Sequence, residues 1–287
     1  MKIGIIPDVH GNPNVKQKLK ILEESNVSKV VILGDYFDSY DANITATKQL
    51  DLLKDLIDYK AQNPDKCDIL LGNHDISYLT SFWGDSRTSG HQFYAAAKIQ
   101  QFLLDNIDQF RIISVYDNWI FSHAGVSSLW LQSSIPNYLY EAELIEKVNF
   151  ANNFAERESV ALLNHCSLDP YGNFPTESCC WIRPPSLIIF GIENYNQCVG
   201  HSPLDLNNKL WGISKRAISK KEYLSEAEKE VSSLQRLHTF YEMSDSDVDS
   251  FLQRSLKSIF CFLDSENNSL YGIVDTETNQ IVVGEVK

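Results

Sequence analysis

Five short polar motifs, each placed directly after an apolar run, carry residue types that bind metal ions. They are Asp8-Val9-His10, Gly34-Asp35 through to Asp38, Gly72-Asn73-His74-Asp75, Ser122-His123 and Gly200-His201. Any one of them alone is typical of a turn or a helix cap. Carboxylates, an amide and imidazoles in ordered succession instead suit Mn²⁺, Fe or Zn²⁺, whereas Ca²⁺ prefers oxygen ligands only. The five together predict a metal centre.

The chemistry expected of such a centre is the hydrolysis of phosphate esters. Two divalent ions roughly 3.5 to 4 Å apart hold phosphoryl oxygens and lower the pKa of a shared water enough to produce hydroxide at neutral pH. Mn²⁺ is the expected metal, with Fe and Zn²⁺ as alternatives, because imidazole ligands favour these ions.

Short β-rich runs alternate with helical patterns in the first 125 residues, which predicts an α/β fold. Strand ends in such a fold bring polar residues to one edge of the sheet. Strands are expected at 2–7, 29–33 and 68–71, helices at 13–24, 43–59 and 92–104, and a hairpin joining 111–116 to 119–122.

The rest of the chain is expected to complete one domain over residues 1–287 with two insertions. Residues 127–180, helical at 141–163, form a possible cap, and 214–257, rich in Lys, Glu and Ser, form a possible helical insertion. Further strands are expected at 187–190 and 197–200. The chain then closes as a β-meander of 258–263, 269–274 and 280–283.

Composition excludes several classes of protein. Of 287 residues, 43% are hydrophobic and 22% are charged, which is typical of a globular chain. The net charge of −13 disfavours non-specific nucleic-acid binding. No apolar run approaches the roughly 20 residues that span a bilayer, so no membrane partner is expected. The N-terminus lacks the features of a signal peptide, so we expect a cytoplasmic protein with reduced cysteines.

The order of the five motifs resembles the calcineurin-like metallophosphoesterase superfamily, whose signature runs DxH, GDxxD, GNH(D/E), H and a final GH block. The resemblance covers residues 8 to 201. It implies a four-layer αββα sandwich of two mixed sheets with helical insertions. The motif endings are most similar to the phosphoprotein-phosphatase and diadenosine-tetraphosphatase-like branch.

The resemblance also implies a role for each motif residue. Asp8 and His10 bind the first metal, and Asp35 bridges both ions. Asn73, His123 and His201 complete the second site, and Asn73 also contacts the substrate. His74 is then the catalytic general acid near the leaving oxygen, oriented by the catalytic carboxylate of Asp38.

Two departures from the family pattern bear on the substrate. Many phosphodiesterases of the superfamily end in GHxH, but Pro203 stands here where their second His would bind metal. The phosphoprotein-phosphatase branch usually follows its second block with Arg-Gly, where this chain has Ser39-Tyr40. Arg183 is the best candidate for the missing phosphate-binding arginine, because a guanidinium matches a phosphoryl group with two hydrogen bonds.

Weaker candidates for substrate binding lie in two charged stretches. Arg87 is a second candidate for the arginine. A basic cluster after the fifth motif would either steer an anionic substrate or, as is commoner, form a solvated helix start; it comprises Lys209, Lys215, Arg216, Lys220 and Lys221.

The expected activity is therefore the hydrolysis of phosphomonoesters or phosphoanhydrides by a two-metal hydroxide mechanism. A phosphorylated small molecule, a nucleotide and a phosphoprotein all remain open as substrates. A phosphodiesterase or nuclease is the alternative, disfavoured by Pro203 and by the negative charge. A catalytically inactive binding scaffold is less consistent with a complete set of ligand residues.

Overall fold

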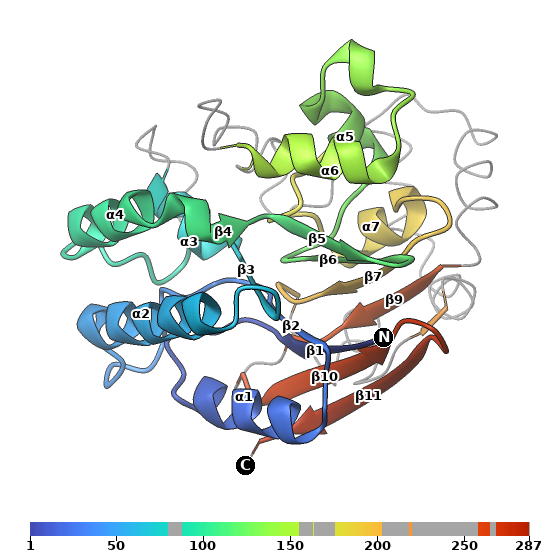
Figure 1. The fold of residues 1–287 in the computed structure, drawn as a ribbon. Helices are drawn as coiled ribbons and strands as arrows, with labels where there is room; N and C mark the ends of the chain where they lie inside the picture. The colour runs from blue at the N-terminus through green and yellow to red at the C-terminus, as the bar shows by residue number, and fades with distance from the viewer. Residues whose placement is uncertain are drawn as a thin grey trace.

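Two mixed β-sheets stacked face to face form the centre of the molecule (Figure 1). The computed structural model describes residues 1–79, 88–154, 163, 176–202, 218–219, 258–264 and 268–286. Strand order is β11-β10-β1-β2-β3-β4 in the first sheet and β5-β6-β7-β9-β8 in the second. The expected α/β sandwich of two mixed sheets is confirmed.

The first sheet has a parallel core with an antiparallel hairpin at one edge. Helices α1 (Asn14–Glu24) and α2 (Ala46–Gln62) connect its first three strands. Its parallel strands are β1 (Lys2–Ile6), β2 (Lys29–Ile32), β3 (Cys67–Leu70) and β4 (Phe110–Arg111), and its hairpin is β10 (Leu270–Asp275) with β11 (Gln280–Glu285).

The second sheet begins with the hairpin expected from the sequence, β5 (Ile113–Tyr116) against β6 (Trp119–Ser122). Strand β7 (Asn196–Val199) then lies parallel to β6, and β9 (Ile259–Phe262) lies parallel to β7. The two-residue strand β8 (Ile218–Ser219) pairs with β9 and is the described part of the stretch 214–257; the rest of that stretch lies outside the described residues.

Helices cover the outer faces of both sheets. In Figure 1, α2 lies to the left of the first sheet and α1 lies below β1, whereas α5 (Ser128–Ser134), α6 (Leu144–Asn152) and α7 (Pro184–Phe190) lie above the second sheet. Helices α3 (Asn73–Leu79) and α4 (Ala96–Asp105) pack together beside the strand ends. Two 3₁₀ turns are η1 (Ile107–Gln109) and η2 (Asn137–Leu139). None of the described helices is both long and apolar enough to cross a membrane.

The central parallel strands β1, β2 and β3 bury both of their faces, which explains their continuous apolar sequences. In β2, Val31 packs toward the second sheet together with Trp119 and Phe121, whereas Val30 and Ile32 pack into the cluster that includes the helices. This alternation binds the layers together and holds the strand ends in place.

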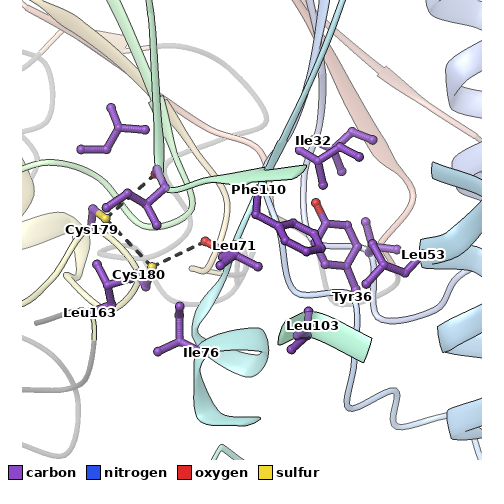
Figure 2. Packing of buried hydrophobic residues seen from close by; sticks show 14 of the residues in the cluster. Ile32, Tyr36, Leu53, Leu71, Ile76, Leu103, Phe110, Leu163, Cys179 and Cys180 are labelled. Atoms are coloured by element: carbon purple, nitrogen blue, oxygen red, sulfur yellow. Dashed lines mark hydrogen bonds between the residues drawn. The ribbon is translucent and has the colours of Figure 1, made fainter. Parts of the chain in front are cut away.

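Figure 2 shows part of the cluster that contains Ile32. The ring of Tyr36 packs against Phe110, and its hydroxyl donates to the carbonyl oxygen of Leu70 at 2.8 Å. The thiol of Cys180 lies 3.5 Å from the carbonyl oxygen of Leu71, next to the buried Cys179. Among the described residues, the five cysteines are free thiols.

Two expectations about secondary structure are wrong. Residues 187–190 belong to helix α7 and not to a strand, because prolines at the first helical positions start a helix there. A run of four apolar residues cannot by itself distinguish a strand from a buried helix. The last strands also form no meander, since β9 pairs in the second sheet and β10 in the first.

Candidate metal centre

All five motifs follow strands that end at the same edge of the sandwich. Asp8 follows β1, Asp35 follows β2, and Asn73 and His74 open α3 after β3. In the second sheet, His123 follows β6, and His201 follows the neighbouring parallel strand β7. Residues up to 193 positions apart in sequence meet here, as shown by the bond from the His201 amide to Asp8 Oδ1 at 3.0 Å.

The backbone at this edge is strained. His10, Asp35, Asp38 and His201 have φ angles of 43°, 55°, 64° and 61°, a region that side-chain-bearing residues rarely adopt. Such conformations persist where the surrounding structure enforces them, and they concentrate at functional sites. The four residues thus turn their side chains sharply away from the strand direction.

Two motif glycines leave room for the carboxylates. A Cβ atom on Gly72 would lie 2.1 Å from Asp35 Oδ1, and one on Gly200 would lie 2.1 Å from Asp8 Oδ1. Any larger residue at either position would displace the carboxylate. The glycine in each of these motifs is therefore explained by close packing against an acidic side chain.

Asp35 lies at the middle of the cluster. Its Oδ2 atom is 3.6 Å from His10 Nε2, 3.4 Å from His123 Nε2 and 3.9 Å from His74 Nε2. Asp35 belongs to two sets of three residues, and within each set the ligand atoms all lie within 4.8 Å of one another. One set is Asp8, Asp35 and His123, and the other is His10, Asp35 and His74. One carboxylate is thus placed to serve two cation positions.

Asn73, His123 and His201 converge on one point. Asn73 Oδ1 lies 2.9 Å from His123 Nε2 and 3.0 Å from His201 Nδ1, and the two imidazole nitrogens are 3.2 Å apart. All three side chains are buried. Three lone-pair-bearing atoms in such close contact are suited to sharing one divalent cation.

The remaining imidazole nitrogens are occupied by backbone carbonyls. His10 Nδ1 lies 2.6 Å from the Phe37 oxygen, and His123 Nδ1 lies 2.9 Å from the Leu33 oxygen. His201 Nε2 lies 3.1 Å from the Trp181 oxygen. A ring nitrogen that donates to a carbonyl leaves the other nitrogen unprotonated and facing the centre, as a metal ligand requires.

Burial favours the neutral form of these imidazoles. It lowers the pKa of His123 to about 4 and that of His10 below the usual range. Burial, together with the nearby Arg183, also lowers the pKa of His201 well below its usual range. Neutral imidazole is the form that binds metal, so these three side chains are ready to do so at neutral pH.

Burial raises the pKa of the carboxyl groups, whereas it lowers that of the imidazoles. Burial, followed by the charge of Asp8, raises the pKa of Asp35 well above its usual range. Burial also raises the pKa of Asp75 to about 7, although Asp75 accepts hydrogen bonds from the amides of Asp35, Tyr36 and Gly72. Crowded buried carboxylates repel one another, and cations between them would relieve this repulsion.

His74 and Asp38 form a buried pair beside the cluster. His74 Nδ1 lies 2.9 Å from Asp38 Oδ2, so Nε2 faces the centre. Asp38 also accepts from the Thr88 hydroxyl at 2.8 Å and from the Tyr78 hydroxyl. Two hydroxyl groups, one from α3 and one from the segment of Thr88, therefore hold Asp38 against the imidazole.

We predict that Thr88→Val lowers kcat about 10-fold, the worth of one hydrogen bond to a charged group. Without this bond, the Tyr78 hydroxyl alone among the described groups supports Asp38 in its place against His74. Steady-state assays with an alkyl phosphate test this, and Thr88→Ser should restore most of the rate because it keeps the hydroxyl. Thr47→Val, on the exposed side of α2, is the matched control. Equal activity in Thr88→Val and wild type would exclude a supporting role for the bond.

Arg183 lies at the start of α7, next to the fifth motif. Its Nη1 atom donates to the His201 carbonyl at 2.8 Å and to the Ser202 hydroxyl at 3.3 Å. The arginine therefore supports the loop that carries His201, and its phosphate-binding role stays a prediction. Arg87, Pro203 and the basic cluster from Lys209 to Lys221 lie outside the described residues.

Sequence reasoning missed three residues that organise the site. Asp75 ties the second and third motifs together through backbone amides, and Tyr78 and Thr88 hold Asp38. Asp75 stands within the third motif, so its position was a usable signal. Nothing in the sequence spacing marks Tyr78 or Thr88, because their partner lies 40 and 50 residues away.

The described structure thus gathers His, Asp and Asn side chains at the strand ends of a sandwich of two mixed sheets. The sequence model of the calcineurin-like phosphoesterase family matches residues 1–205. The chain therefore belongs to this family, and it is a metal-dependent phosphoesterase by membership.

Other comparisons yield distant similarities. A protein serine/threonine phosphatase from Saccharomyces cerevisiae, with similarity to human phosphatase PP5, is 11% identical with a TM-score of 0.48, covering 100% of this chain and 80% of its own. A metallophosphoesterase from Sphaerobacter thermophilus is 15% identical with a TM-score of 0.43, and the match covers 100% of this chain and 89% of the Sphaerobacter chain. No curated protein sequence matches this chain.

Proposed function

We propose that this protein hydrolyses phosphomonoesters or phosphoanhydrides with two divalent metal ions. The observation that carries the proposal is Asp35, which belongs to both sets of ligand atoms and lies beside the His74–Asp38 pair. Phosphoryl transfer to water needs a pair of cations and, beside them, a group that donates a proton to the leaving oxygen.

The residues present fit two cations. Asp35 would be shared. As the family resemblance implies, Asp8 and His10 would hold the first ion, and Asn73, His123 and His201 would hold the second. The sets of neighbouring ligand atoms instead place Asp8 with His123 and His10 with His74. Bound divalent ions polarise phosphoryl oxygens and lower the pKa of a water molecule. Mixed imidazole and carboxylate ligands favour Mn²⁺, with Fe and Zn²⁺ as alternatives.

The protein's own side chains would handle the leaving group. His74 Nε2 faces the centre and would give its proton to the departing oxygen, while Asp38 stabilises the positive imidazole before transfer. We further propose that the chain is nearest the phosphoprotein-phosphatase and diadenosine-tetraphosphatase-like branch, because Pro203 stands where many phosphodiesterases carry a metal-binding His.

Removal of metal should abolish hydrolysis and also destabilise the fold, because the buried carboxylates then repel one another. We expect a chelator to silence the enzyme and Mn²⁺ to restore it better than Mg²⁺ does. At 100 times its dissociation constant, Mn²⁺ should stabilise the protein by about 2.7 kcal/mol, visible as a rise in Tm.

Metal analysis and thermal unfolding read this out independently of turnover. Equal restoration by Mg²⁺ and Mn²⁺ would argue that the histidines are not ligands. A purified protein that binds no divalent ion would instead support the inactive scaffold.

A further inference from the structure

The candidate metal centre opens toward solvent on the side of His10 and His74. Their side chains are 13% and 10% exposed, whereas those of Asp35 and His123 are 2% and 0% exposed. The rings of His10 and His74 meet edge to face with centroids 4.8 Å apart. A substrate therefore approaches the centre past these two rings.

Tyr40 stands at this opening with its ring uncovered. The ring centroid lies 6.4 Å from that of His10, and the residue is 73% exposed. Its hydroxyl lies 2.5 Å from Ser89 Oγ, and the preceding residue, Thr88, donates to Asp38. The ring is thus held at one end by the segment that supports the catalytic pair, while its faces remain available.

Two further aromatic side chains are exposed on the same segment. Phe93 and Tyr94 are largely exposed, and the Phe93 ring meets His91 at 4.9 Å. His91 in turn stacks on Tyr78, the tyrosine that donates to Asp38. Single exposed aromatic residues are ordinary, so we single out Tyr40, whose ring is the exposed one that lies beside His10 among the described aromatic contacts.

We propose that Tyr40 stacks on the base of a nucleotide whose phosphoryl group is hydrolysed at the metal centre. The inference depends on the proposed function. Aromatic faces bind nucleobases by stacking, with little dependence on the particular base. Tyr40 stands two residues after Asp38, the last residue of the second motif, and its ring lies beside His10, with the two ring centroids 6.4 Å apart.

The catalytic pair favours a nucleotide over an aryl phosphate. A proton from His74 helps most when the leaving oxygen is a poor leaving group, such as the 5′ oxygen of ribose. In a nucleotide, the base is separated from the leaving oxygen by the ribose, whereas in an aryl phosphate the ring is bonded to that oxygen directly. Water adds its oxygen to phosphorus, the bond from phosphorus to the 5′ oxygen breaks, and His74 protonates that oxygen, which yields a nucleoside and inorganic phosphate.

The test compares adenosine 5′-monophosphate with ribose 5-phosphate, which share a leaving group and differ by the base. With Mn²⁺, wild type should show a kcat/KM about 10-fold higher for the nucleotide, the size of one stacking contact. Tyr40→Leu should bring this ratio close to one, and Tyr40→Phe should keep it because the ring remains. Tyr138→Leu, at a comparably exposed tyrosine in η2, is the matched control and should keep the wild-type ratio.

A ratio near one in wild type, or an unchanged ratio in Tyr40→Leu, overturns the inference. If nitrophenyl phosphate is hydrolysed with Mn²⁺ in that case, the proposed function stands and only the stacking role is lost. If no phosphoester is hydrolysed, the proposed function fails. The dissociation constants of adenosine 5′-monophosphate and ribose 5-phosphate, measured by calorimetry on the Mn²⁺-loaded protein, then decide whether Tyr40 binds the base.

Discussion

Asp35→Asn is expected to lower kcat by at least about 10³-fold, because no other described residue belongs to both sets of ligand atoms. Its Oδ2 atom lies 3.6 Å from His10 Nε2 and 3.4 Å from His123 Nε2. A neutral amide removes the negative charge that would hold two cations close together. The amide also presents an NH₂ group that cannot act as a ligand.

Metal analysis and activity together give the readout. We expect Asp35→Asn to lose at least one of two bound ions while its far-ultraviolet circular dichroism stays that of wild type. Asp51→Asn, the same chemical change on the exposed side of α2, is the control and should behave as wild type. Wild-type turnover in a folded Asp35→Asn protein would remove the two-metal assignment altogether.

His74→Asn is expected to keep both ions and lose turnover in a way that depends on the leaving group. Alkyl phosphates, whose leaving oxygen needs a proton, should be hydrolysed about 10²- to 10⁴-fold more slowly. Nitrophenyl phosphate should lose far less, because nitrophenolate departs unprotonated. Asp38→Asn should show the same pattern with a smaller loss, since Asp38 acts through His74.

Asn73→Ala provides the contrasting pattern. Asn73 contacts His123 and His201, so its loss should weaken metal binding and slow both substrates alike. His74 Nε2 is itself 3.9 Å from Asp35 Oδ2, a separation that also suits a direct ligand. Loss of one ion from His74→Asn, with equal slowing of both substrates, would assign His74 to the metal and end its role as a general acid.

The gathering of the motif residues at one edge of the sandwich could be predicted from the sequence because each motif is contiguous and follows an apolar run. Alternating strands and helices place such motifs at strand ends, and the structure brings the motif residues from Asp8 to His201 together there. The β5–β6 hairpin was equally predictable, since its strands are adjacent and joined by a short turn.

The tertiary structure alone decided which distant segments meet. A four-residue apolar run gives no period to separate helix α7 from a strand, and sequence order does not reveal that β9 and β10 join different sheets. The support of Asp38 by Tyr78 and Thr88, and the place of Tyr40 beside His10, likewise depend on contacts between separate segments. Such contacts form because packing two sheets and their helices buries the most apolar surface, a property of the whole chain and of no single motif.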